Sequence, residues 1–127
     1  MFGMRIILDT NFLLIPGQFH VDIFSEIQRI AFFPYTLAVL SPTLEELRKI
    51  ASRKGADARA AELSLQLLEA KKVEIVDTRQ AYADAAILEA ATSETIVATQ
   101  DKGLISKLGK KGIQIIRMRS KKHLILQ

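Results

Sequence analysis

The stretch Arg5-Ile6-Ile7-Leu8-Asp9-Thr10-Asn11-Phe12 decides the fold of this chain. Its apolar residues 6–8 are consecutive and do not alternate with polar residues. Such a run is typical of a strand that is buried on both faces, as in a parallel sheet. Asp9 follows this strand directly. We therefore expect its carboxylate at the carboxyl edge of the sheet, where open α/β sheets place their functional clefts.

Predicted strands and helices alternate along the rest of the chain. Short apolar runs predict strands, and apolar residues at helical spacing predict helices. We expect strands at 5–8, 37–40, 73–76, 95–99 and 113–116, helices at 21–30, 41–53, 56–70, 81–91 and 101–108, and a turn at Pro16-Gly17. This order predicts an α/β fold whose helices cover both faces of a mostly parallel five-stranded sheet. We interpret residues 1–127 as one domain with a basic tail at 117–127.

The composition excludes some classes of protein. The chain has no cysteine, which excludes disulfides and thiolate metal sites. No apolar stretch approaches the roughly 20 residues of a membrane-spanning helix, and the N-terminus runs straight into a strand, so we expect no signal peptide and a cytoplasmic protein. The net charge of +4 and the pI of about 9.5 indicate an anionic partner, although many proteins are this basic for solubility alone.

Two aspartates follow predicted strands at matching positions. Asp9 follows the first strand, and Asp101 follows the strand at 95–99. The carboxyl ends of parallel strands meet at one edge of a sheet, so both carboxylates belong to the same edge. Taken alone, an aspartate after a strand is more often a helix N-cap or a turn residue, and the matching pair shifts the balance toward a functional site.

A third aspartate lies on the apolar face of a predicted helix. At about 100° per residue, Asp84 shares a face with Ile87, Leu88 and Ala91, whereas Glu89 points away. A carboxylate on a buried face is costly unless it is paired or binds a metal. The alternative is that Asp84 occupies the first helical turn, where the helix dipole favours it and water still reaches it.

One glutamate of the helix at 41–53 is also directed inward. Glu46 borders the apolar face of this helix, whereas Glu45 lies nearly opposite and meets solvent. The alternative for Glu46 is a capping box with Thr43, because Thr-x-x-Glu fits that pattern. Converging carboxylates raise one another's pKa, and a divalent cation removes the conflict. Oxygen ligands favour Mg²⁺ or Mn²⁺ over zinc, and His20 and His123 are expected at the surface.

These acidic residues resemble, in order, the four acidic motifs of PIN-domain ribonucleases. The four motifs are Asp9-Thr10-Asn11-Phe12, Glu46-Leu47, Tyr82-Ala83-Asp84 and Ala98-Thr99-Gln100-Asp101-Lys102. The resemblance extends over residues 6–118. The residues of the motifs are most similar to those of the archaeal and eukaryotic branch that processes ribosomal RNA. The chain departs from that branch at Ala85, where a second aspartate is common. This departure puts a second metal, or full activity, in question.

The resemblance implies a fold, an activity and a set of roles. The fold is a three-layer α/β/α sandwich, and the activity is that of a homodimeric endoribonuclease that uses Mg²⁺ or Mn²⁺. The implied catalytic residues are Asp9, Glu46, Asp84 and Asp101. Of these, Asp9, Asp84 and Asp101 would bind the metal directly or through waters, assisted by Glu46. The side chains expected to orient these ligands are Thr10, Asn11 and Thr99.

The proposed partner is RNA, with ribosome assembly or an antitoxin as a further possible context. The cations that we expect to contact the RNA backbone are Arg48, Lys49, Lys102 and Lys107, with Arg53, Lys54, Lys110, Lys111 and the tail as further candidates. Phe12 is adjacent to the site, but core packing is its simpler interpretation. Two alternatives stay open: an RNA-binding assembly module without catalysis, which Ala85 supports, and a toxin ribonuclease that is held by an antitoxin.

Overall fold

A computed structural model describes residues 3–127, so Met1 and Phe2 of the expected N-terminus lie outside the described residues. The elements follow one another as β1 (Met4–Leu8), α1 (Thr10–Leu13), α2 (Ile15–Phe19), α3 (Ile23–Ile30), β2 (Tyr35–Leu40), α4 (Ser41–Ala51), α5 (Ala56–Ala70), β3 (Glu74–Val76), α6 (Ala83–Ala90), β4 (Thr95–Ala98), α7 (Lys102–Lys110), β5 (Gln114–Arg119) and β6 (His123–Leu126). No helix within the described range is both long enough and apolar enough to cross a bilayer.

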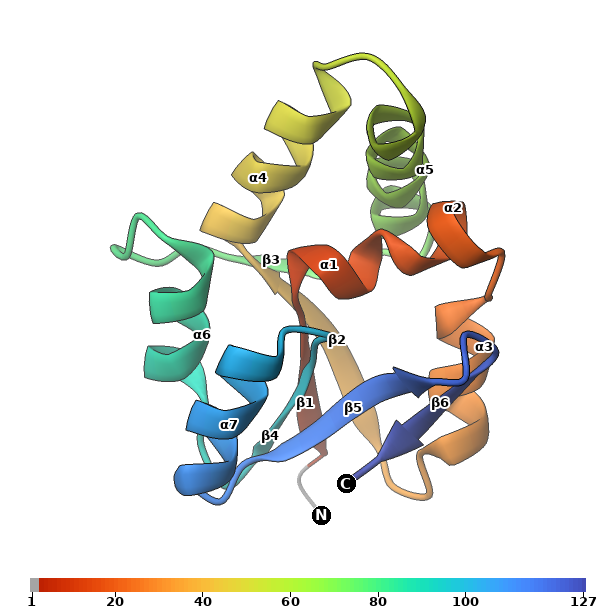
Figure 1. Cartoon of the computed structure of the whole chain (residues 1–127). Coiled ribbons are helices and arrows are strands. Elements are labelled where there is room, and N and C mark those ends of the chain that lie inside the picture. The colour runs from red at the N-terminus through yellow and green to blue at the C-terminus, as the bar shows by residue number, and fades with distance from the viewer. Residues whose placement is uncertain (1–2) are drawn as a thin grey trace.

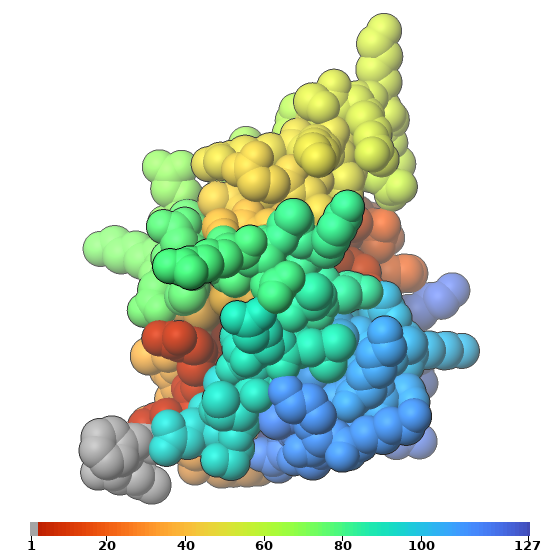
Figure 2. Space-filling model, turned by 90° about the vertical axis from the view of Figure 1, so that its left-hand side faces the viewer, coloured from red at the N-terminus to blue at the C-terminus, as the bar shows by residue number. Residues whose placement is uncertain are grey.

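The strands form a sheet with helices on both sides (Figure 1). The strand order is β3-β2-β1-β4-β5-β6, and every pair is parallel except β5 with β6. One face packs against α1, α2, α3, α5 and the leucines of α4, and the other packs against α6 and α7. Figure 2 shows the second face, on which α6 and α7 lie below α4. The predicted α/β sandwich with a mostly parallel sheet is confirmed.

The central strand β1 joins two separate apolar cores. Successive side chains of a strand point to opposite faces. Ile6 and Leu8 therefore lie in the core that includes Phe12, and Ile7 lies in the core beneath α6 and α7. All three strand residues are at most 1% exposed, and each such burial contributes about 1.5–3 kcal/mol. The prediction of a strand buried on both faces is confirmed, as is core packing of Phe12, which is fully buried.

The predicted basic tail is wrong, because the chain ends in a sixth strand. Residues 123–126 form β6, which pairs with β5 and buries Leu124 completely. The prediction of a tail rested on the cations at 117–122, although the apolar residues at 124–126 follow them. The turn between β5 and β6, at residues 120–122, contains no glycine or asparagine that would indicate a turn in the sequence. Instead, Ser120 and Lys121 adopt positive φ angles of 57° and 55°, a conformation that costs about 1–3 kcal/mol per residue.

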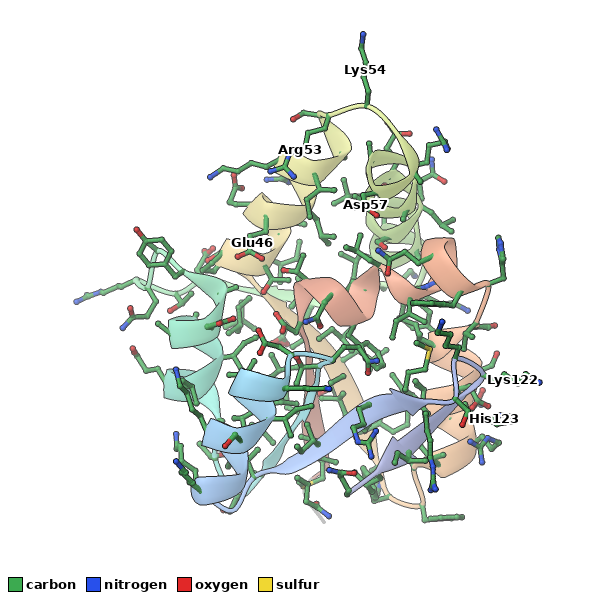
Figure 3. The ribbon with its side chains drawn as sticks, viewed as in Figure 1. Glu46, Arg53, Lys54, Asp57, Lys122 and His123 are labelled. Atoms are coloured by element: carbon green, nitrogen blue, oxygen red, sulfur yellow. The ribbon has the colours of Figure 1, made fainter. Side chains whose placement is uncertain are left out.

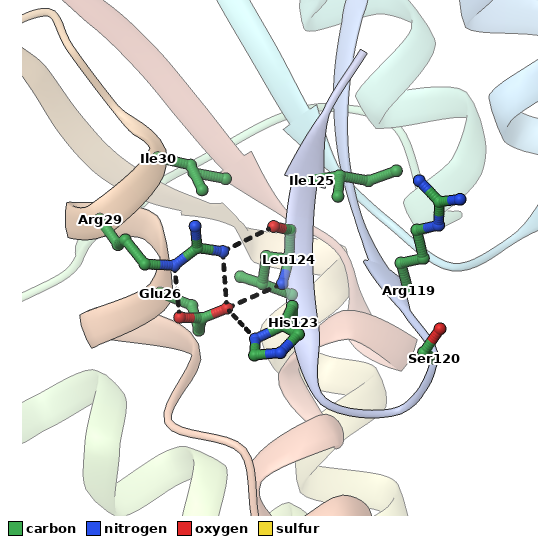
Figure 4. Close-up of a pocket in the computed structure, with 8 residues that line it drawn as sticks. All are labelled: Glu26, Arg29, Ile30, Arg119, Ser120, His123, Leu124 and Ile125. Atoms are coloured by element: carbon green, nitrogen blue, oxygen red, sulfur yellow. Dashed lines mark hydrogen bonds and ion pairs between the residues drawn. The ribbon is translucent and has the colours of Figure 1, made fainter.

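Side chains of α3 close the outer edge of β6 (Figure 4). Glu26 accepts a hydrogen bond from the Leu124 N–H at 3.0 Å, and Arg29 donates to the Leu124 carbonyl at 3.2 Å. Arg29 also donates to Glu26 at 2.8 Å, and this hydrogen bond is the main reason why the pKa of Glu26 is lowered to about 2. The edge that another chain would otherwise pair with is thus occupied at Leu124.

The predicted turn at Pro16-Gly17 is also wrong, because both residues lie in α2. Proline is favoured in the first turn of a helix, where its missing N–H costs nothing. Gly17 lies against α5, and a Cβ atom at this position would be 2.6 Å from the Cα and Cβ of Ala60. The glycine therefore permits close contact between two helices, and it does not mark the end of one.

Candidate active site

Asp9 is buried at the carboxyl edge of the sheet, between β1 and α1. It is the N-cap of α1, and its Oδ1 accepts a hydrogen bond from the Thr10 N–H at 2.8 Å. Its Oδ2 accepts a hydrogen bond from the Thr99 hydroxyl at 2.7 Å. The residue is only 4% exposed. Asp9 therefore does act as a helix cap, but a cap on a short surface turn does not need this degree of burial.

Thr99 and Asn11 connect Asp9 to the turn that carries Asp101. Thr99 follows β4, which is the parallel neighbour of β1, and its Oγ1 accepts a hydrogen bond from the Asp101 N–H at 3.1 Å. Asn11 Oδ1 accepts from the Gln100 N–H at 3.0 Å. The two side chains thus fix the turn after β4 against the turn after β1. This is the arrangement expected of residues that orient the acidic groups.

Asp101 is half-buried and caps α7. Its Oδ1 accepts a hydrogen bond from the Leu104 N–H at 3.0 Å, so the capping interpretation describes one of its two oxygens. The other oxygen accepts no hydrogen bond from residues 3–127. One carboxylate oxygen therefore remains available for a ligand. Strand topology alone placed Asp9 and Asp101 at the same edge, and the structure brings their turns together through Thr99.

Glu46 reaches the site from α4 and contacts the residue after Asp9. The Thr10 hydroxyl donates to Glu46 Oε1 at 2.5 Å, and Figure 3 shows Glu46 directed from α4 toward the end of the sheet. The capping box with Thr43 is wrong, because Leu40 is the N-cap of α4. The Thr43 hydroxyl is completely buried and has no hydrogen-bond partner among the described residues.

Asp84 lies in the first turn of α6 and is exposed, as the alternative interpretation expects. Its charge still acts on the site, because it raises the pKa of Asp9. Glu89 points away, as predicted, and pairs with Gln80 at 2.5 Å. Asp84 is therefore near enough for its charge to act on Asp9, although it is not buried with Asp9.

Burial raises the pKa of Asp9 from 3.8 to about 6. The hydrogen bonds from Thr99 and Thr10 oppose this effect, and the charges of Asp84 and Glu46 add to it. A carboxylate that is buried beside two other acids is costly to ionise without a cation. The electrostatics of this edge therefore fit a bound cation.

The four acids do not close directly around one point. Within residues 3–127, no three acidic or histidine side chains are placed to hold one metal ion together. Mg²⁺ keeps several waters and needs only one or two carboxylates, so a site bridged by water fits these groups. Both histidines lie at the surface, as expected.

The structure separates the basic residues into several groups. Arg53 and Lys54 lie at the far end of α4 (Figure 3), and Arg48 pairs with Glu45 at 2.9 Å. Lys111 donates to the Leu88 carbonyl at 2.6 Å and so holds the end of α6, a structural role that sequence reasoning missed. Among the candidate RNA contacts that were predicted, Lys102 adjoins the acidic residues most directly, since it follows Asp101.

Gln100 is the residue at the site whose importance sequence reasoning missed. Its Oε1 accepts a hydrogen bond from the Met118 N–H at 2.6 Å and so ties the turn after β4 to β5. The position of Gln100 between Thr99 and Asp101 was the available signal. Nothing in the sequence, however, reveals a contact with a residue on another strand.

Known proteins share both sequence and fold with this chain. A family model described as a PIN like domain matches residues 6–121. Ribonuclease VapC4 of Methanocaldococcus jannaschii is 35% identical over 124 residues, which are 94% of this chain and 93% of that protein.

Two solved structures share the fold. The PIN domain endonuclease Utp24 gives a TM-score of 0.81 at 22% identity, over 97% of this chain and 90% of that chain. A domain of a functionally unknown protein from Methanocaldococcus jannaschii gives a TM-score of 0.65 at 16% identity, over 93% of each chain. Because the family model matches residues 6–121, which are most of the chain, and a relative is 35% identical over most of its length, the chain belongs to the PIN-like domain family.

Proposed function

We propose that this chain is a metal-dependent endoribonuclease that hydrolyses phosphodiester bonds of RNA. The observation that carries the proposal is the burial of Asp9 beside two further acids at the carboxyl edge of the sheet. Membership of the PIN-like family and the identity to a protein named a ribonuclease support it.

Each acidic residue has a proposed part in this activity. Asp9, Asp84 and Asp101 would hold a Mg²⁺ or Mn²⁺ ion, directly or through waters, with assistance from Glu46 on α4. When bound, such an ion would lower the pKa of a bound water and would stabilise the charge that develops on the phosphate. Thr10 keeps Glu46 directed at the site by its hydrogen bond. The proposed supporting groups Asn11 and Thr99 hold the two turns together.

We further propose ribosomal RNA processing as the role, in a cytoplasmic homodimer. The similarity of the motifs to that branch supports this role. A toxin ribonuclease with an antitoxin partner is the alternative within the same activity. The proposed contacts to the RNA backbone are Arg48, Lys49, Lys102 and Lys107. Phosphate contacts position RNA without reading its sequence, so they do not identify the target RNA.

A second candidate function is an RNA-binding assembly module without catalysis. Ala85 favours it, because this half-buried alanine stands directly after Asp84, where the processing branch often has a second aspartate. A site with fewer acids holds fewer metal ions and carries less activity.

An RNA cleavage assay with Mn²⁺ or Mg²⁺ separates these functions. We expect the wild type to cut RNA and Asp9→Asn to lose nearly all activity. A matched control is Asp57→Asn, which removes one carboxylate from α5 (Figure 3), and it should retain full activity. If the wild type and both variants bind RNA but none of them cuts it, the enzyme proposal fails and the assembly module takes its place.

A further inference from the structure

A groove between α7 and β5 opens beside the candidate active site. Its volume is about 520 Å³, and its lining consists of Gln100, Lys102, Ile105, Ser106, Arg117 and Met118. Gln100 belongs to both the groove and the candidate active site. It lies between Thr99 and Asp101, and its backbone N–H donates to Asn11 Oδ1 at 3.0 Å. The groove therefore begins where the hydrogen-bond network around Asp9 ends.

The lining of the groove is basic and contains no carboxylate. Lys102 stands on the α7 wall, and Arg117 stands on the β5 wall. Four other surface grooves of residues 3–127 each include at least one aspartate or glutamate. Cations on opposite walls without an acid between them favour an anionic occupant. The absence of a carboxylate distinguishes this groove from those four.

Hydrogen-bond donors in the groove are held in place by the fold. The Gln100 side chain is fixed because its Oε1 accepts from the Met118 N–H at 2.6 Å. Its amide nitrogen donates no hydrogen bond to any residue of the described chain, so it is available to a ligand. Arg117 is fixed similarly, since its Nε donates to Gln127 at 2.9 Å. Its guanidinium forms no ion pair within residues 3–127, and its terminal nitrogens remain as donors.

We propose that this groove binds the phosphate backbone of a single-stranded RNA segment that leads to the candidate active site, with Lys102, Arg117 and the amide of Gln100 as the contacts. This inference rests on the proposed function, because it takes RNA as the substrate. A phosphodiester chain offers the charge and the acceptor oxygens that these donors require. A volume of about 520 Å³ is within the range of small-ligand sites and suits a short segment of single strand.

The salt dependence of RNA binding tests the two cations. The full chain is titrated in EDTA against an end-labelled oligouridylate, over a series of KCl concentrations, with fluorescence anisotropy as the readout. Each lost phosphate contact reduces the slope of log K against log salt by about 0.7 for a single strand. We expect the double variant Lys102→Gln/Arg117→Gln to bind about tenfold more weakly, with a slope smaller by about 1.4.

The matched control for the cations is Arg59→Gln, which removes one exposed arginine from α5, on the other side of the sheet. Its slope should equal that of the wild type. The proposal is overturned if the double variant and this control have the same slope. It is also overturned if the wild type binds no oligouridylate.

Gln100→Glu tests the amide without disturbing the fold. The new carboxylate still accepts the Met118 N–H, but it replaces the amide donor with a negative charge inside the groove. We expect binding to weaken about tenfold by like-charge repulsion of phosphate. Gln114→Glu makes the same change at an exposed position at the start of β5 and should leave binding unaltered. Equal affinities of these two variants would contradict a role for Gln100.

A duplex probe and a cleavage assay complete the test. An oligouridylate–oligoadenylate duplex should bind more weakly than the single strand, and equal affinity with the same dependence on Lys102 and Arg117 would refute the preference for a single strand. Because binding is measured in EDTA, it does not depend on catalysis. If the wild type cleaves RNA with Mn²⁺ but the groove variants bind RNA as the wild type does, only the proposed RNA-binding role of the groove is refuted. If the groove variants bind RNA more weakly but the wild type does not cleave it, the RNA-binding role of the groove is supported and the proposed endonuclease activity is refuted.

Discussion

Replacement of Asp9 by asparagine should stabilise the metal-free protein near neutral pH. Burial raises the pKa of Asp9 from 3.8 to about 6, and the charges of Asp84 and Glu46 contribute to the same effect. At 1.36 kcal/mol for each factor of ten, the gap between these pKa values corresponds to about 3 kcal/mol. This is the cost of ionising Asp9 in the folded protein when no cation is present.

The sign of the pH dependence follows from proton linkage. The folded protein binds the Asp9 proton more tightly than the unfolded chain does. The stability that protonated Asp9 contributes is therefore fully present below pH 3.8 and is lost as the pH rises through about 6. Asparagine carries no charge, but its amide group no longer accepts the Thr99 hydroxyl at Oδ2, which costs about 1 kcal/mol. We expect Asp9→Asn to gain about 2 kcal/mol at pH 7 and to gain nothing at pH 4.

Urea unfolding in EDTA at pH 7 and pH 4 measures both values. Asp57→Asn serves as the control, because its carboxylate is exposed on α5 and should show no such gain at neutral pH. If Asp9→Asn is less stable than the wild type by the same amount at both pH values, the buried charge is not the source of the cost. Saturating Mn²⁺ should reverse the order of stability, because only the wild type gains from metal binding, by about 2.7 kcal/mol at one hundred times its Kd.

Four further substitutions test other features of the structure. Asp84→Asn should leave the metal-free melting temperature equal or higher, because a like-charge conflict is relieved, and a marked decrease would indicate a capping role. Thr43→Val removes a buried hydroxyl that has no partner among residues 3–127, so urea unfolding should show a gain of about 1 kcal/mol, and a loss would mean that the hydroxyl is bonded. Gly17→Ala brings a Cβ atom to 2.6 Å from Ala60 and should cost about 1–3 kcal/mol in the same assay, whereas unchanged stability would refute the close contact of α2 with α5. Glu26→Gln should cost about 1–3 kcal/mol above pH 4.5, and the difference should fade as the pH falls through about 2; a difference that does not change with pH would contradict the lowered pKa of Glu26.

The sheet was predictable where its signal is local. Consecutive apolar residues at 6–8 indicated β1, because a strand that is covered on both faces reads as such a run. The order of the strands was not predictable, since it depends on pairing between residues far apart in the chain. β6 escaped prediction because its turn uses Ser120 and Lys121 at positive φ, where a sequence pattern expects glycine or asparagine.

The candidate site was predictable to the extent that topology fixes it. Asp9 and Asp101 follow β1 and β4, and these strands are parallel neighbours, so one edge was expected for both. The hydrogen bond between Thr10 and Glu46 joins residues 36 positions apart, and a periodic pattern carries no information about it. Helical periodicity placed Asp84 on an apolar face, yet this residue is exposed because it occupies the first turn of α6.

The proposed metal site can be observed in a crystal structure of the protein soaked in Mn²⁺, by means of an anomalous difference map. Manganese scatters anomalously, and the map therefore locates the ion without reference to the protein atoms. We predict a peak at the carboxyl edge of the sheet, among Asp9, Asp84 and Asp101, that disappears in Asp9→Asn. A map without a peak at this edge, from crystals at a Mn²⁺ concentration that supports cleavage in solution, would contradict the proposed metal site.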